Sequence, residues 1–386
     1  MSSHLAWRAK RAYVFQDYAW NPEHFPWKFD GVPHTPINAL LAGPTAGGPW
    51  SINDNAPRSI SKRWFDAVCP PEDTKVIVAS DAKDPIRGSD AKKTLEYWVK
   101  LLNDTAERCV DVVNGDFSKD NHPQTFDLWF VILPSLNNIV HLTIQPLYRT
   151  ISNENVLPLW EEFRDSPVSR LLRAPPLIAS AIRDNEHLFF PSSSKLSHPN
   201  ARYDSMLAIH LRQGDYFDAC KGFSDWNSSF FMWNLLPDLP DPLHRVSVPT
   251  GSLEPGKNTA ENYEIYRRRC YPTADELAQR IHQVKMEWEA SHSGQETLRS
   301  LFLMTNAKKD FLGPFVKRMK REGWETIVTS KDLAMSSPEQ TAVGMAIDMD
   351  IGRQAAVFLG NGVSAARYVL PTYPDCGLLH VVVISD

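Results

Sequence analysis

The sequence predicts an α/β fold with two domains, and three observations lead to this prediction. The chain has 386 residues, 42% of them apolar, which is enough for two ordinary hydrophobic cores. In the second half, short apolar runs alternate with amphipathic helical stretches, as in a parallel sheet with right-handed crossovers. A polar segment rich in Ser and Pro, 191–200, precedes this alternation. We therefore expect one domain over residues 1–200 and a second over residues 201–386.

The first domain contains strand and helix signals around a long irregular stretch. A helical opening leads into a short strand at 12–15, and closely spaced Pro and Gly residues over 21–57 predict a surface excursion. Apolar side chains at helical spacing between Leu95 and Leu102 predict a helix that packs on a sheet. The expected elements are strands at 76–79 and 109–113, helices at 91–102, 157–163 and 176–188, and an apolar stretch at 128–144 that fits either a strand or a buried helix.

The second domain alternates more regularly. It opens with a buried strand from Met206, which is followed by a Pro- and Trp-rich loop over 223–262. Thr273 is placed to cap a helix over 274–290. The remaining expected elements are strands at 301–304, 326–328 and 355–360, and helices at 311–322 and 340–351.

The strand that opens the second domain ends in a polar turn, in the sequence M-L-A-I-H-L-R-Q-G-D from Met206 to Asp215. Open α/β sheets bind ligands beyond the carboxyl ends of their strands. Arg212 is therefore placed where its guanidinium could bind a phosphate through two hydrogen bonds. Gly214 would let the backbone turn closely beside that ligand. His210 points to the same side of the strand as Arg212 and could hydrogen-bond the same ligand.

A purely structural role is the alternative for both Arg212 and His210. Arg212 could pair with Asp215 and hold the turn together, and His210 could be a satisfied histidine beside a core strand. The residues alone leave these alternatives open.

The segment H-L-R-Q-G-D-Y-F-D-A-C, residues 210–220, resembles the central motif of the GDP-fucose protein O-fucosyltransferases and the related α1,6-fucosyltransferases, in which a strand ends in H-x-R-x-G-D. Further segments occur in the same order as in fungal members of that family: C-Y-P-T at 270–273, M-T-N-A at 304–307, S-K-D-L at 330–333, D-M-D-I at 348–351 and V-F-L-G-N-G-V-S at 357–364. The resemblance covers about residues 201–364 and is much weaker before them.

The resemblance implies a GT-B fold, in which two Rossmann-like domains face a central cleft. The second domain would hold GDP-fucose and the first would hold the acceptor. The implied reaction is an inverting transfer of fucose to a hydroxyl group of a protein or glycan, with no metal and no cofactor besides the donor substrate. Arg212 would then stabilise the negative charge that develops on the departing GDP.

Asp348 and Asp350 form a D-x-D pattern, which many glycosyltransferases use to hold a divalent metal. Both lie in an expected helix, where alternate positions do not face one another, so we do not expect a metal site here. The resemblance instead places Asp348 against the guanine base, because a carboxylate can accept from both N1–H and N2–H. For Asp350 we expect a solvated helix charge.

The end of the last expected strand offers further contacts to a diphosphate. Gly360, Asn361 and Ser364 supply small residues, backbone N–H groups and a hydroxyl. The family has a second Ser or Thr directly after the position of Ser364, where this chain has Ala365. The residues from Arg367 onward do not resemble the family, so we expect a divergent carboxyl terminus.

An inverting transfer also needs a group that deprotonates or orients the acceptor hydroxyl. The resembling enzymes supply it from the amino-terminal domain, largely from a segment upstream of the place where this chain begins. Asp17, on the turn after the strand at 12–15, is our candidate. The opening helix has no preceding strand, so we expect a truncated amino terminus.

The five cysteines are an odd number for a disulfide framework. Cys220 and Cys270 both lie in the region of resemblance. Cys220 follows the turn that contains Arg212, and Cys270 lies where a helix is expected to begin. We expect these two to form a disulfide, with reduced, buried thiols as the alternative.

Composition limits the partners and the location. A net charge of −5 gives no indication of a nucleic-acid partner. No apolar run approaches the roughly 20 residues that a membrane helix needs, and the residues after Met1 show no signal-peptide pattern. A complete chain of this sequence would be cytosolic, whereas the resemblance implies the lumen of the ER or Golgi.

Two other hypotheses stay open. The first is a truncated or inactive relative that binds a GDP-sugar without transferring it. The second is a cytosolic α/β interaction protein in which H-L-R-Q-G-D is only a structural turn; Arg212→Ala would then change stability and no ligand affinity.

Overall fold

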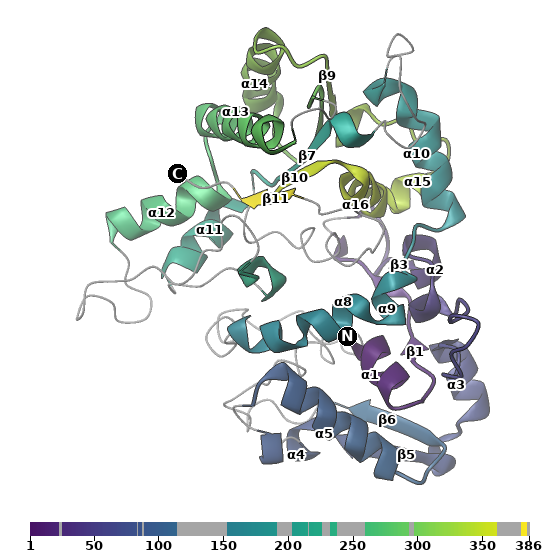
Figure 1. Cartoon of the computed structure of the whole chain (residues 1–386). Helices are drawn as coiled ribbons and strands as arrows, with labels where there is room; N and C mark the ends of the chain where they lie inside the picture. Colours follow the sequence, from purple (N-terminus) through teal and green to yellow (C-terminus); the bar gives the residue numbers. More distant parts are fainter. Residues whose placement is uncertain are drawn as a thin grey trace. The chain divides into compact units, whose positions relative to one another are not determined.

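The computed structural model describes residues 1–22, 25–82, 84–86, 89–113, 153–190, 203–214, 216–225, 232–237, 259–292, 297–360 and 380–383 (Figure 1). The chain divides into two compact units, the first within Met1–Leu177 and the second from Ile178 onward. Both units combine helices with parallel strands, so the predicted α/β class is confirmed. The expected boundary at 191–200 and the stretch 128–144 lie outside the described residues, and the division into donor and acceptor domains stays a prediction.

The described strands of the first unit form small, separate sheets. β1 (Val14–Phe15) pairs in parallel with β4 (Ile60–Ser61), and β5 (Thr74–Val78) pairs in parallel with β6 (Cys109–Val113). An antiparallel pair links β2 (Tyr18–Ala19) to β3 (His34–Thr35). The predicted strands at 76–79 and 109–113 correspond to β5 and β6.

Helices surround these strands. They are α1 (Ser2–Arg8), α2 (Ile37–Leu40), α3 (Lys62–Val68), α4 (Ala79–Ala82), α5 (Ala91–Asp104), α8 (Trp160–Asp165) and α9 (Pro167–Arg170). The predicted helix at 91–102 is α5, which buries Leu95 and Trp98. The predicted helix at 157–163 begins instead as a 3-10 helix, Asn153–Leu159, which α8 directly follows.

The second unit is built on a five-stranded parallel sheet in the order β11-β10-β7-β8-β9. Three of the strands, β7, β8 and β10, are buried almost throughout. Parallel strands that are covered on both faces have continuous apolar sequences, which explains why the sequence predicted them. The strands are β7 (Met206–Leu211), β8 (Ser300–Thr305), β9 (Thr326–Thr329), β10 (Val357–Gly360) and β11 (His380–Val383), the last of which was not predicted.

Two helices cover one face of this sheet (Figure 1). They are α13 (Ala274–Ser291) and α14 (Lys309–Arg321), and they share one hydrophobic core with alternate residues of β7, including Ile209 and Leu211. Each fully buried Leu or Ile side chain contributes roughly 1.5–3 kcal/mol. This core therefore holds β7 firmly up to its last residue.

The opposite face carries α10 (Pro176–Phe189) and α16 (Gly344–Gln354). Phe189 of α10 contacts Phe302 of β8 edge to face, with ring centroids 5.4 Å apart. A Cβ at Gly352 of α16 would lie 3.0 Å from the methyl group of Met304, so the absence of a side chain there brings α16 close to the sheet.

Some helices of the second unit differ from the predictions. Neither α11 (Tyr216–Asp225) nor α12 (Ala260–Cys270) was predicted, and α12 begins inside the loop expected at 223–262. α12 is highly charged and buries few side chains, so its sequence lacks a continuous apolar stripe. Cys270 ends α12 and does not open a helix. The helix expected at 340–351 is divided into α15 (Pro338–Ala342) and α16.

Each unit contains a disulfide. Cys220 is joined to Cys270, the pairing expected from the resemblance, and Cys69 is joined to Cys109, which was not predicted. Cys69 and Cys109 are buried with Phe65 between α3 and β6. Among the described residues, no helix combines the length and the apolar character that crossing a membrane requires.

Candidate functional site

The carboxyl edge of the five-stranded sheet brings together several of the predicted site residues. From β7 the chain runs outward through β8 to β9, and then returns to β10 on the other side of β7. Open α/β sheets bind ligands where neighbouring strands are connected in opposite directions in this way. Gly360, the last residue of β10, is in register with His210 of β7. The carboxyl ends of these two strands therefore lie side by side at the expected ligand position.

Arg212 lies on the turn that follows β7, the middle strand. Gly214 of this turn has a φ of 67°, which glycine adopts without strain. The guanidinium carbon of Arg212 lies 5.3 Å from the ring centroid of Tyr216, so a cation–π contact orients the side chain. Asp215, the alternative ion-pair partner of Arg212, lies outside the described residues. This turn thus carries a permanent positive charge at the expected ligand position.

His210 points to the face of the sheet that α16 covers, because its neighbours Ile209 and Leu211 point into the opposite core. Burial, assisted by the charge of Arg212, lowers the pKa of His210 to about 4. The imidazole is therefore neutral at pH 7. A neutral imidazole can donate one hydrogen bond to a ligand without adding charge.

Asp348 of α16 lies at the same edge of the sheet. Its Oδ2 accepts a hydrogen bond of 2.6 Å from the hydroxyl of Ser330, which directly follows β9. Burial raises the pKa of Asp348 to about 7, although the Ser330 hydrogen bond acts in the opposite direction. Near neutral pH this carboxyl is therefore present partly in the protonated form, which can donate a hydrogen bond, and partly in the ionised form, which only accepts.

Asp350 has a different environment from Asp348. Its carboxylate accepts from Arg353 Nε at 2.7 Å and from Gln354 Nε2 at 3.1 Å, and the residue is buried. The expectation of a solvated charge was therefore wrong, because Arg353 lies one turn further along the helix and neutralises it. The two carboxylates of the D-x-D pattern bind separate partners. Among the described residues, no three His, Cys, Asp or Glu side chains are grouped so that they could hold a metal ion.

Two residues of this edge had no role assigned from the sequence. The backbone N–H of Gln213 donates to Asn306 Oδ1 at 2.7 Å, and the side chain of Gln213 donates to the carbonyl of Pro272 at 3.1 Å. Asn306 belongs to the M-T-N-A segment of the resemblance, which was the available signal. Its partner Gln213 is 93 residues away along the chain, so sequence spacing could not reveal the contact.

The other predicted residues are placed as follows. Gly360 is buried at the end of β10. Asn361 and Ser364 lie outside the described residues. Asp17 belongs to the first unit, where it is exposed on the turn between β1 and β2.

Comparison with known proteins gives no matching family model and no matching curated sequence. Among solved structures, the chain is similar to a crystal structure of POFUT1 in complex with GDP, with a TM-score of 0.48 and 12% identity over 99% of this chain and 92% of that chain. It is similar to POFUT1 in complex with GDP-fucose at a TM-score of 0.48 and 13% identity, over 99% and 91% of the two chains. Similarity at this level supports no conclusion about the function of this chain.

Proposed function

We propose that the protein transfers fucose from GDP-fucose to a hydroxyl group of a protein or glycan acceptor, with inversion and without a metal. The observation that carries the proposal is the position of Arg212, at the carboxyl end of the middle strand and beside the reversal between β7 and β10. The H-x-R-x-G-D pattern around it supports GDP-fucose as the donor. In this proposal the fold is of the GT-B type, the second domain binds the donor and the first binds the acceptor.

Arg212 has the central role in the proposed donor complex. Its guanidinium binds the diphosphate through charge-assisted hydrogen bonds, and His210 donates a further one. The cation is in place before the reaction and needs no reorganisation when charge develops. The other proposed diphosphate contacts come from Gly214, Gly360, Asn361 and Ser364.

Asp348 is proposed to bind the guanine base. Guanine presents N1–H and N2–H together, and an ionised carboxylate can accept from both. Because these donors stabilise the ionised form, guanine binding would lower the pKa of Asp348 from about 7 and release a proton from the protonated fraction.

The proposed reaction is a single displacement. The acceptor oxygen forms a bond to C1 of fucose on the face opposite the diphosphate, while the bond between C1 and the phosphate oxygen breaks. The electron pair of that bond leaves with GDP, whose added negative charge Arg212 stabilises. The acceptor proton passes to a base, for which the exposed Asp17 is our candidate.

The two disulfides support a location in the secretory pathway. Disulfides form and persist in oxidising compartments and are rare in the cytosol. Cys69–Cys109 and Cys220–Cys270 are therefore consistent with the ER or Golgi lumen that the resemblance implies.

Calorimetric titration of the purified chain in EDTA tests this proposal. GDP and GDP-fucose are compared with GMP and UDP, for the natural sequence and for Arg212→Ala. Arg318→Ala is the matched control, because Arg318 lies on the surface of the same unit and pairs with Asp275 and Glu322. We expect GDP to bind in preference to GMP and UDP, with a loss in Arg212→Ala and none in Arg318→Ala.

The same titration, combined with an assay of fucose transfer to added acceptors, separates the alternative functions. Binding of GDP-fucose in the titration without transfer in the assay would identify an inactive GDP-sugar-binding protein. A folded Arg212→Ala variant with unchanged GDP affinity, or a natural sequence that binds no GDP, would leave an α/β interaction protein as the better hypothesis.

A further inference from the structure

Gln213 lies between Arg212 and Gly214 in the turn that follows β7, and two hydrogen bonds hold it in place. It is only 6% exposed, and both its backbone N–H and its side-chain amide donate hydrogen bonds to distant segments. A buried amide without a partner costs about 1–3 kcal/mol, so these bonds are strongly favoured. The turn that carries Arg212 is thereby attached at its centre.

The first attachment joins the turn to the neighbouring strand. Leu211 and Thr305, the last residues of β7 and β8, are in register, so Asn306 stands directly beside the turn. Its Oδ1 accepts from the backbone N–H of Gln213 at 2.7 Å. The backbone directly after Arg212 therefore cannot rotate without breaking this bond.

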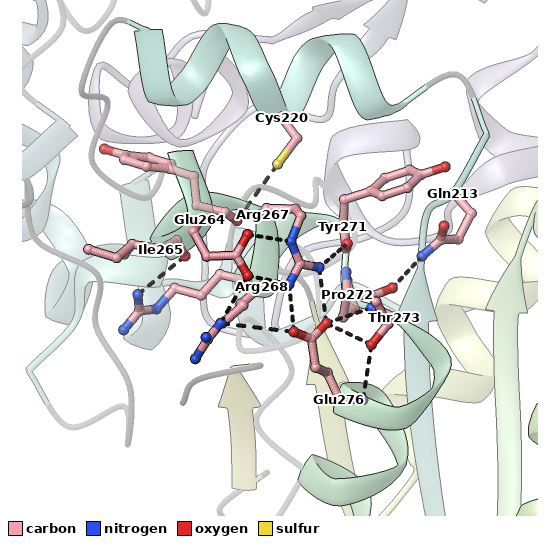
Figure 2. A network of polar contacts seen from close by, with 12 residues as sticks. Gln213, Cys220, Glu264, Ile265, Arg267, Arg268, Tyr271, Pro272, Thr273 and Glu276 are labelled. Atoms are coloured by element: carbon pink, nitrogen blue, oxygen red, sulfur yellow. Dashed lines mark hydrogen bonds and ion pairs between the residues drawn. The ribbon is translucent and has the colours of Figure 1, made fainter. Parts of the chain in front are cut away.

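The second attachment joins the turn to the corner between α12 and α13. Pro272, whose carbonyl accepts from the Gln213 side chain, lies in this corner (Figure 2). Thr273 caps α13 in a capping box with Glu276. Arg267 of α12 donates to the carbonyl of Tyr271 at 3.2 Å and to Glu276 at 3.0 Å. The residues on both sides of Pro272 are thus fixed.

The disulfide strengthens the same corner. Cys270 ends α12 two residues before Pro272, and its partner Cys220 lies on α11. The first residue of α11 is Tyr216, whose ring contacts Arg212. The corner therefore contacts the Arg212 turn through Gln213, the neighbouring strand contacts it through Asn306, and the disulfide joins the corner to the helix that begins at Tyr216.

We propose that Gln213 and Asn306 are positioning residues, which hold Arg212 in the orientation that binds the diphosphate. This inference rests on the proposed function, because it assigns these two residues a task at the same site. Neither residue needs to touch the ligand. Their effect on binding passes through Arg212.

Two nearly isosteric variants, Gln213→Met and Asn306→Leu, remove the bonds and keep the volumes. GDP affinity is measured by calorimetry, and the affinity for guanosine, which has no phosphate, is measured by ligand-observed NMR. Gln340→Met is the matched control, because Gln340 is also buried, and its side-chain amide accepts from the nearby backbone N–H of Ser336 and donates to the distant hydroxyl of Ser180. Arg212→Ala is measured in parallel.

We expect both variants to weaken GDP binding by about tenfold and to leave guanosine binding unchanged. Arg212→Ala should likewise weaken the binding of GDP and not that of guanosine. Gln340→Met should lower the melting temperature without changing the affinity for either ligand. Equal losses for GDP and guanosine would show general loosening of the unit and overturn the proposal, as would unchanged GDP affinity in both variants. If Arg212→Ala itself leaves GDP affinity unchanged, the proposed function fails, and the positioning role fails with it.

Discussion

Each unit has a histidine close to an arginine, but His4 is fully buried, His210 is half-buried, and the two pairs lie in different settings. In the first unit, His4 and Arg8 lie one turn apart on α1, and both contact the carboxylate of Glu162 on α8. In the second unit, His210 and Arg212 lie at the end of a buried parallel strand. Burial is the main cause of a lowered pKa in both histidines, to about 3 for His4 and about 4 for His210.

The comparison shows that a displaced pKa does not by itself identify a functional residue. His4 and Arg8 meet a carboxylate supplied by the neighbouring helix, so their polarity contributes to the packing of α1 on α8. His210 and Arg212 lie where the topology of the sheet favours a ligand. The position in the fold, more than the electrostatics, separates the two pairs.

The largest expected effects concern the disulfides of the two units. The closed loops span 40 residues for Cys69–Cys109 and 50 for Cys220–Cys270. The chain-entropy estimate for loops of this length is about 4 kcal/mol of unfolding free energy for either bridge. We expect Cys69→Ala/Cys109→Ala to lower the urea midpoint of the first unit only, and Cys220→Ala/Cys270→Ala to destabilise the second unit.

GDP titration of the same variants, at a temperature where each stays folded, sharpens the comparison. The Cys220–Cys270 pair supports the corner that holds the Arg212 turn, so its removal should also weaken GDP binding. An equal loss of GDP affinity in both double variants would contradict the assignment of the donor site to the second unit.

Replacing Arg212 and replacing Arg8 should have clearly different effects on GDP affinity. Arg212→Ala should weaken GDP binding about 100-fold, because two charge-assisted hydrogen bonds contribute roughly 3 kcal/mol. Arg8→Ala should lower stability by about 1 kcal/mol, since its partner Glu162 is partly exposed, and should leave GDP affinity unchanged. Calorimetric titration and thermal unfolding of both variants measure these effects. A similar change in GDP affinity for Arg212→Ala and Arg8→Ala would contradict a ligand-binding role that belongs to the second pair alone.

Asp348→Asn should change stability and binding in opposite directions. Because the folded pKa is about 7 and the ordinary value is 3.8, the native state holds an extra proton between these values, and stability falls as pH rises through this range. The variant should therefore melt at a higher temperature than the natural sequence at pH 8 and at a similar temperature near pH 4. Its GDP affinity should fall about tenfold at pH 8 through loss of the carboxylate acceptor.

The natural sequence should also bind GDP more tightly as pH rises through 7. The phosphate groups titrate near pH 6, so the decisive quantity is the ratio of the two affinities, natural sequence to Asp348→Asn. A ratio that does not change between pH 6 and 8 would show that Asp348 does not ionise in the complex.

The sequence predicted those parts of the second unit whose signals are local. β7, β8 and β10 are continuous apolar runs because both faces of the sheet are covered. The start of α13 was predictable from Thr273, whose capping box spans four residues. The position of Arg212 at a strand end followed from the abrupt change to polar residues after Ile209.

Other features depend on tertiary contacts and were therefore missed. α12 is charged on most sides and is stabilised by the disulfide and by ion pairs such as Arg267 with Glu276. The two-residue strands of the first unit are too short for a periodic signal. The raised pKa of Asp348 depends on burial that the fold alone creates.

The smallest expected effect concerns the two histidines themselves. His210→Asn should weaken GDP binding by about three- to tenfold, because it alters the single hydrogen bond proposed between His210 and the diphosphate, whereas His4→Asn should not change it. Both imidazoles are neutral in the folded protein, and their folded pKa values lie below the ordinary value of 6.5. The stability that this neutrality confers is complete above pH 6.5 and is lost as pH falls toward 4 for His210 and 3 for His4. Imidazole resonances followed by NMR should therefore stay constant between pH 6 and 8 for both residues, and addition of GDP should shift only the His210 resonance of the pair. A shift of the His4 resonance of equal size would mean that the ligand reaches the first unit's helix pair, and that sheet topology does not distinguish the two histidines.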